Sequence, residues 1–149
     1  MVFRVNSNVL NLIKKRNANL KLHSNIDPSI LFVSGYGPGY IKVGERTLND
    51  TFVLTPSEIH TDLGIGTIQT LNTKALTMLE AISLEILLIG TGELQQAPPV
   101  TLIAELSSQR IGVEYMATPA ACRTFNILAA EQRRVAALLF IDNRYSSES

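Results

Sequence analysis

Apolar residues in the second half of the chain fall into patterns that predict buried strands alternating with helices. The segments 84–89 and 135–141 are almost continuously apolar, which is typical of strands covered on both faces. The spacing of apolar residues predicts helices over 73–81, 99–109 and 119–132, and a further strand over 112–116. Strands and helices therefore alternate, and the sequence predicts an α/β domain with a parallel core.

The first half of the chain shows shorter apolar segments. The β-rich segments 30–33, 40–43 and 52–54 are separated by glycine, proline and an Asn-Asp pair, which are residues typical of tight turns. This pattern predicts hairpins, although it leaves the order of the strands open.

Composition and charge limit the class of protein. The chain has 149 residues, of which 46% are hydrophobic, and no apolar run approaches the ~20 residues of a membrane-spanning helix. We expect one α/β domain over residues 20–149 and no transmembrane segment. The first 25 residues carry five basic side chains and no acidic one, whereas the rest carry eight basic and thirteen acidic side chains, a net charge of −5. This excess of acid argues against nucleic-acid binding, which needs cations to neutralise phosphates.

The basic residues 1–19 allow two interpretations. Their lack of acid and the apolar residues between positions 9 and 13 are typical of a mitochondrial targeting segment, but serine and arginine are few. We therefore favour a flexible leader, with the domain beginning at Leu20. The single cysteine excludes an internal disulfide and is typical of a reducing compartment. No group of residues has metal-ligand spacing, so neither a metal nor another cofactor is expected.

A glycine turn, Gly90-Thr91-Gly92, follows the strand predicted over 84–89. Ligands of α/β proteins bind in crevices beyond the carboxyl ends of such strands, so the position suits a binding site. Gln95, however, stands where a dinucleotide-binding motif has its third glycine, and no phosphate-binding lysine follows. We favour a tight turn whose glycines permit positive φ and close backbone approach, with a ligand role as the alternative.

The helix predicted over 119–132 carries the other candidate residues. Thr118 is expected to cap this helix, and Cys122, Arg123 and Asn126 fall on a different face from the apolar stripe. Together with the glycine turn and the glutamine that follows it, these three residues form a candidate binding site. Their face is expected to meet solvent, a neighbouring loop or a partner.

Cys122 is the strongest catalytic candidate, because the first helical turn and the adjacent Arg123 favour a thiolate. A cysteine nucleophile also needs a base, and neither of the two histidines has a recognisable spacing to Cys122. We therefore favour a small buried apolar residue and assign no catalytic residue. Arg123 is expected either to bind an anion or to pair with Glu85, Glu114 or a backbone carbonyl.

Several of these segments, taken in order, resemble one known family. They are the segments 36–43, 52–56, 84–92 and 120–128 together with Gln95, Pro98, Pro99, Gly112, Val113, Glu114, Met116 and Thr118. Through these residues and their spacing, the chain is similar to the mitochondrial complex I assembly factor 3 family and its bacterial relatives from Leu20 to Ile141. It departs from the family pattern at Phe125, where tyrosine is expected, and in having no tryptophan.

The resemblance implies both a fold and a function. The fold is a three-layer α/β architecture with a mixed central sheet, helices on its faces and a small additional β layer from the N-terminal hairpins. The function is that of a non-enzymatic assembly protein whose partners are respiratory-complex subunits or assembly proteins. Its location is the cytoplasm of a bacterium or the matrix side in a mitochondrion. The alternative is a small-molecule or anion-binding protein, including a thiol-assisted enzyme, with its site at the glycine turn and the helix of Cys122 and Arg123.

Overall fold

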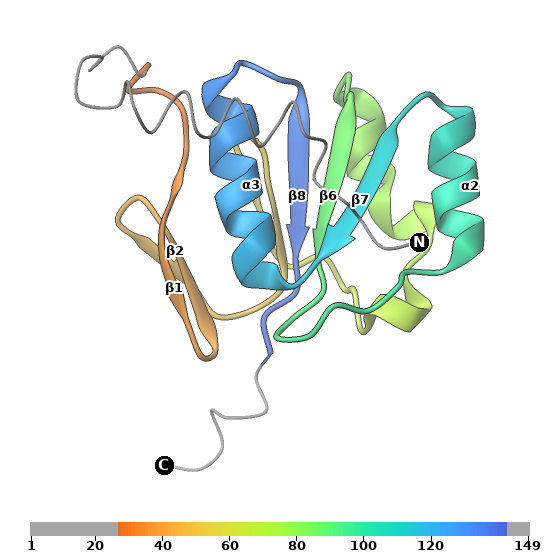
Figure 1. Cartoon of the computed structure of the whole chain (residues 1–149), viewed down its shortest axis with the longest axis horizontal. Helices are drawn as coiled ribbons and strands as arrows, with labels where there is room; N and C mark the ends of the chain where they lie inside the picture. Colours follow the sequence, from red (N-terminus) through yellow and green to blue (C-terminus); the bar gives the residue numbers. More distant parts are fainter. Residues whose placement is uncertain (1–26, 143–149) are drawn as a thin grey trace.

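The computed structural model describes residues 27–142, which form two β-sheets and the helices packed against them (Figure 1). The leader predicted over residues 1–19 lies outside this part of the chain, as do residues 143–149. The strands are β1 (Val33–Gly37), β2 (Tyr40–Val43), β3 (Arg46–Leu48), β4 (Phe52–Leu54), β5 (Ile59–His60), β6 (Ile86–Gly90), β7 (Gly112–Met116) and β8 (Val135–Leu139). The helices are the 3-10 helices η1 (Ile68–Thr70) and η2 (Thr73–Ala81) and the α-helices α2 (Val100–Ser108) and α3 (Thr118–Ala130).

The larger sheet has five strands in the order β5-β4-β8-β6-β7. Strand β6 runs parallel to β7 and β8, whereas β4 is antiparallel to β8 and β5. The mixed central sheet implied by the resemblance is therefore confirmed. The two most apolar segments of the sequence form its centre, and all five residues of β8 are buried, as expected for a strand covered on both faces.

Successive residues of the central strands pack into two separate cores, because side chains alternate between the two faces of a sheet. Leu88 shares a core with Phe125 of α3, whereas Leu87 and Ile89 share the other core with Leu102 of α2. One face of the sheet is thus covered by α3, and the other by α2 and η2 (Figure 1).

The smaller sheet has the strand order β1-β2-β3 and packs against the outer side of α3 (Figure 1). Ile41, Val43 and Leu48 of this sheet share a core with Phe125. The additional β layer is therefore confirmed, and it has a consequence for the helix. Because α3 lies between two sheets, it is buried on two sides.

The first strand lies later in the chain than the sequence predicts. The apolar segment 30–33 indicates a strand, but the ladder of β1 begins at Val33 and continues to the turn at Pro38 and Gly39. Gly39 has φ +75°, a conformation that favours glycine and fixes the position of the turn. Residues 30–32 instead pack as partly buried apolar side chains against the core. Sequence reasoning missed β3 and β5, because neither contains an apolar run like that of β4: β3 has a single apolar residue, Leu48, and β5 has only two residues.

The helix predicted over 73–81 is present, but it is the 3-10 helix η2 and has a kink at Leu76. Residues three apart share a side of a 3-10 helix, which brings both Leu76 and Leu79 into the core. The predicted helix and its bounds are therefore confirmed, and the structure adds the helix type, which the sequence pattern left open.

Helix α3 ends at Ala130 rather than at position 132. Gln132 has φ +59°, which lies in the left-handed region and is incompatible with an α-helix. Strand β8 ends at Leu139 rather than at position 141. Among residues 27–142, every helix is too short or too polar to form a membrane span.

Candidate functional site

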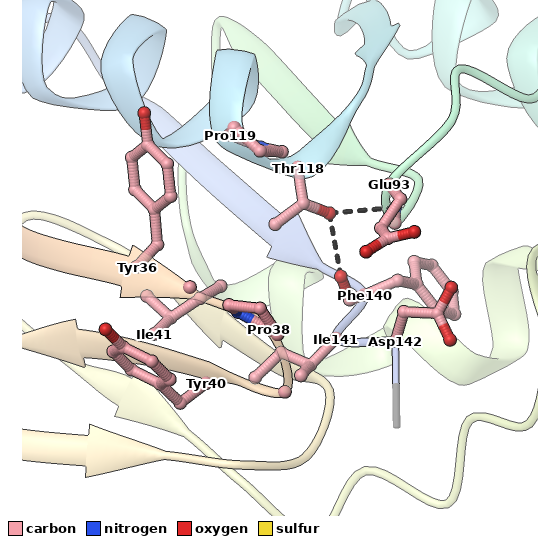
Figure 2. A pocket seen from close by; sticks show the side chains of 13 residues that line it. Tyr36, Pro38, Tyr40, Ile41, Glu93, Thr118, Pro119, Phe140, Ile141 and Asp142 are labelled. Carbon is pink, nitrogen blue, oxygen red and sulfur yellow. Dashed lines mark hydrogen bonds between the residues drawn. The ribbon is translucent and has the colours of Figure 1, made fainter. Parts of the chain in front are cut away.

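A groove lies where the carboxyl ends of β6 and β8 meet the start of α3 and the turn between β1 and β2 (Figure 2). Its volume is about 300 Å³, at the lower end of the range of small-ligand pockets. Most of its described lining side chains are apolar or aromatic, and the two that carry charge, Glu93 and Asp142, are both acidic. The lining comes from four segments that are far apart in the chain: 36–41, 92–93, 118–119 and 140–142.

Thr118 joins three of the segments around this groove. Its Oγ1 accepts a hydrogen bond from the Gly92 N–H at 2.8 Å and donates one to the Phe140 carbonyl oxygen at 2.7 Å (Figure 2). The predicted role of Thr118 as the N-cap of α3 is wrong, because Ala117 occupies that position and Thr118 is the first helical residue. The buried hydroxyl group instead connects the turn after β6, the start of α3 and the end of β8.

The glycine turn needs both of its glycines for structural reasons. A Cβ at Gly90 would lie 2.9 Å from the Thr118 Oγ1 and 3.0 Å from the Leu139 Cδ2, which leaves no room for a side chain. Gly92 has φ +99°, a conformation that favours glycine. These two features agree with the favoured interpretation of a tight turn with positive φ and close backbone approach.

Backbone N–H groups of the turn, which an anion would use, already have partners. The Thr91 N–H donates to the Met116 carbonyl oxygen and the Gly92 N–H to Thr118, each at 2.8 Å. The Thr91 hydroxyl donates to the Leu94 carbonyl oxygen at 2.7 Å and so orders the following loop. This arrangement favours a structural turn over a phosphate-binding turn.

Two candidate residues of α3 hold the smaller sheet against the helix. Asn126 bonds both backbone groups of Val33: its Oδ1 accepts from the N–H at 2.8 Å, and its Nδ2 donates to the carbonyl oxygen at 2.9 Å. The Arg123 Nη1 donates to the hydroxyl group of Tyr36 at 2.6 Å. Arg123 therefore binds a phenol, rather than one of the glutamates or carbonyl groups that the sequence suggests. Since Tyr36 lines the groove, Arg123 supports one of its walls.

Cys122 lies in the core that α3 shares with the two sheets, and it is only 1% exposed. Burial raises the pKa of its thiol to about 12, although the charge of Arg123 acts in the opposite direction. Such a thiol is protonated at neutral pH, which agrees with a buried apolar residue and not with a nucleophile. Within residues 27–142, no group of three His, Cys, Asp or Glu side chains is placed to hold a metal ion.

Glu85 binds the segment that follows α3. Its carboxylate accepts hydrogen bonds from the backbone N–H of Arg134 at 3.0 Å and from the Arg133 Nε at 3.3 Å. The bond from the backbone, more than the arginine charges, lowers the pKa of Glu85. Through these two bonds, Arg133 and Arg134 connect the exit of α3 to the start of β6.

The seven candidate residues do not share one surface. Gly92 lines the groove, Gln95 is exposed on the loop beyond it, and Cys122 is enclosed in the core. The role of these residues in binding stays a prediction. The sequence signals that point to the groove are the glycine turn, the start of the helix at 118–119 and the segment 36–43 of the family resemblance. The groove residues that none of these signals includes are Glu93, Phe140, Ile141 and Asp142.

A family model described as "Protein of unknown function (DUF498/DUF598)" matches residues 33–140, a segment that includes both sheets and α3. The chain belongs to this family. The match covers the groove lining from the β1–β2 turn to Phe140, whereas Ile141 and Asp142 lie just beyond its last residue.

Two curated relatives show which proteins the chain is similar to. The "13 kDa major membrane protein" of Francisella tularensis subsp. holarctica (strain LVS) is 37% identical over 75 residues, which are 50% of this chain and 61% of the relative. NADH dehydrogenase (ubiquinone) 1 alpha subcomplex assembly factor 3 of Danio rerio is 31% identical over 108 residues, which are 72% of this chain and 62% of the relative. The chain thus spans less than two thirds of the length of either relative. The resemblance to the assembly factor 3 family and its bacterial relatives is confirmed.

A solved structure supports the same fold. The crystal structure of a protein from Bordetella parapertussis matches with a TM-score of 0.71 and 31% sequence identity, covering 76% of this chain and 98% of the other. The α/β architecture with two sheets is therefore shared with a bacterial protein over almost its whole length.

Proposed function

We propose that this chain is a non-enzymatic binding protein that helps to assemble a respiratory complex through protein–protein contacts. Its similarity to NADH dehydrogenase (ubiquinone) assembly factor 3 supports this proposal. The partners are respiratory-complex subunits or assembly proteins. The contacts form in the cytoplasm if the cell is bacterial and on the matrix side if it is eukaryotic.

The lining of the groove is the observation that carries the proposal. Aromatic and apolar side chains are the usual anchors of protein interfaces, and the groove is rich in them. Tyr36 is 38% exposed at its edge, and Leu94, in the loop that continues from Glu93, is 70% exposed. Exposed aromatic and apolar side chains of this kind suit contact with a protein partner.

The same lining disfavours the small-molecule alternative. An anionic metabolite needs cations or free backbone donors, but the charged groups among the described lining residues are carboxylates. The N–H groups of Thr91 and Gly92 already have partners, and Cys122 is buried. The geometry therefore supports a binding surface for a protein better than a site for an anion or a thiol enzyme.

Affinity purification of the full chain from its native cell under mild conditions tests the proposal. We expect recovery of respiratory-complex subunits or assembly proteins. Arg123→Ala should reduce this recovery several-fold, because it releases the Tyr36 side chain from its place at the groove. Arg46→Ala, which removes an exposed arginine of β3, is the matched control and should leave recovery unchanged.

The opposite result would be a chain that recovers none of these proteins. If, in addition, a small molecule from the cell extract raises the thermal stability of the chain and needs Gly92 to do so, the small-molecule alternative replaces the proposal. A ligand that binds only the folded state must stabilise that state.

A further inference from the structure

We infer that the groove binds an extended segment of the partner protein that carries a lysine or arginine beside apolar side chains. This inference rests on the proposed function and deepens it, since it names the surface that meets the partner and the chemistry of the contact. Three properties of the groove lead to it: the sign of its charge, the nature of its lining and the rigidity of its walls.

The charges around the groove select a cationic occupant. Glu93 and Asp142 lie on the same side of the groove, opposite Tyr36 (Figure 2). No lysine or arginine is among the described lining residues. Arg123 is not a lining residue, and its guanidinium group donates to the hydroxyl group of Tyr36, on the side of the groove away from the two carboxylates. An acidic segment would be repelled at the carboxylates, whereas a basic one would be attracted.

The apolar lining indicates a peptide segment rather than a free cation. Tyr36, Pro38 and Tyr40 form the side of the groove contributed by the β1–β2 hairpin, and Ile141 adds to its floor (Figure 2). A lysine or arginine can pack its long stem on such side chains, or place its charge over a tyrosine ring, while its head reaches a carboxylate. A small ion would leave these apolar surfaces uncovered. Neighbouring apolar residues of a peptide would cover them.

The walls are formed without a partner. The Tyr40 ring occupies the space that a side chain at position 37 would need, because a Cβ at Gly37 would lie 2.6 Å from the Tyr40 Cε1. Thr118 fixes the opposite wall through its two buried hydrogen bonds, and Arg123 holds the phenol of Tyr36. A preformed groove loses little conformational entropy when a segment binds.

The chain offers a matched pair of variants that tests the shape of the groove. Gly37→Ala introduces a methyl group against the Tyr40 ring, and this ring can rotate away, so the groove changes at little cost to the fold. Gly35→Ala is the control on the same strand, because its new Cβ would meet nothing within 4 Å. Neither glycine has a positive φ that would strain an alanine.

A second pair of variants tests whether the negative charge of the groove contributes to binding. Glu93→Lys reverses an exposed carboxylate at the groove. Glu45→Lys reverses an exposed carboxylate in the turn between β2 and β3, outside the groove. Both residues lie at the surface, so both variants should fold normally.

The experiment places the photo-crosslinking residue p-benzoylphenylalanine at position 38 of the full chain in its native cell. The captured segment is identified by mass spectrometry, synthesised as a peptide, and its affinity for the full chain is measured by calorimetry. We expect a segment with a lysine or arginine next to apolar residues. Glu93→Lys should weaken its binding about tenfold, and changing the cation of the peptide to glutamate should restore binding to this variant. Gly37→Ala should weaken binding several-fold, whereas Gly35→Ala and Glu45→Lys should match the wild type.

Other occupants overturn the inference. Capture of the chain's own terminal residues, of a second copy of the chain, or of an acidic segment would show that the groove has a different role. Equal affinity of Glu93→Lys and Glu45→Lys for the captured peptide would also overturn the inference. If affinity purification recovers respiratory proteins but the crosslinker at position 38 captures none of them, the inference fails while the proposed function stands. If neither experiment yields these proteins, both fail.

Discussion

Replacement of Asn126 by alanine is expected to destabilise the protein by about 2 kcal/mol. The Asn126 side chain makes two hydrogen bonds, of 2.8 and 2.9 Å, to the backbone of Val33. Each such bond contributes about 0.5–1.5 kcal/mol to the free energy of unfolding, which gives a range of about 1–3 kcal/mol for the pair. Both backbone groups are part-buried, so losing their partner places the expected cost in the middle of this range or above.

The Asn126→Asp variant separates the two bonds. Aspartate keeps an acceptor for the Val33 N–H but places an oxygen against the Val33 carbonyl oxygen, where the amide donor now lies at 2.9 Å. At neutral pH we expect this repulsion to make the aspartate variant no more stable than the alanine variant, although aspartate has the same shape as asparagine.

Urea unfolding of the full chain measures these differences as shifts in the midpoint at unchanged slope. Asn49→Ala is the control, because Asn49 makes a single exposed hydrogen bond of 3.2 Å to Gly39. Its effect should stay within about 0.5 kcal/mol. If Asn126→Ala proves no more harmful than Asn49→Ala, the idea that Asn126 holds the smaller sheet on α3 is refuted.

Three further predictions concern single side chains. Thr118→Val should lower the free energy of unfolding by about 2–5 kcal/mol, because two buried backbone groups lose their hydrogen-bond partner. Thr124→Val, which removes only a 3.5 Å contact with a methionine sulfur, should lower it by less than about 1 kcal/mol, and urea unfolding compares the two variants. Cys122 should remain unmodified by iodoacetamide at mildly alkaline pH while the protein is folded and react once it is unfolded, and rapid labelling of the folded state would contradict its burial. Burial raises the pKa of Glu114, so the folded state holds this proton more tightly and loses stability as pH rises from the ordinary carboxyl pKa through the raised one. Glu114→Gln should therefore be more stable than the wild type at neutral pH, and this difference should vanish below about pH 4.

The local pattern of apolar residues predicts the central part of the fold. Strand β7 has the predicted bounds, and the apolar segments that became β6 and β8 were recognised because strands buried on both faces are continuously apolar. The predicted bounds are wrong at the ends of helices and strands, because the backbone conformation of a single residue can end an element. The φ of +59° at Gln132, for example, ends α3 earlier than any apolar spacing suggests.

The candidate site was less predictable because its contacts join distant parts of the chain. Arg123 and Asn126 find their partners in β1, 87 and 93 positions earlier in the sequence. A helical wheel places Cys122 off the apolar stripe of α3, but α3 lies between two sheets, so this side of the helix is buried as well. The groove depends on the same long-range packing. The glycine turn and the segment 36–43 each mark one part of its lining, but no local motif shows that these parts come together.

The amount of fully assembled NADH dehydrogenase (ubiquinone) in cells that lack this chain is the most direct test of the proposed function. Native gel electrophoresis of membranes from the deletion strain should show a loss of the assembled complex, and expression of the wild-type chain should restore it. Expression of Gly35→Ala should also restore it, whereas Gly37→Ala should restore it only in part if the groove is the contact surface. A deletion strain with a normal amount of assembled complex would contradict the account.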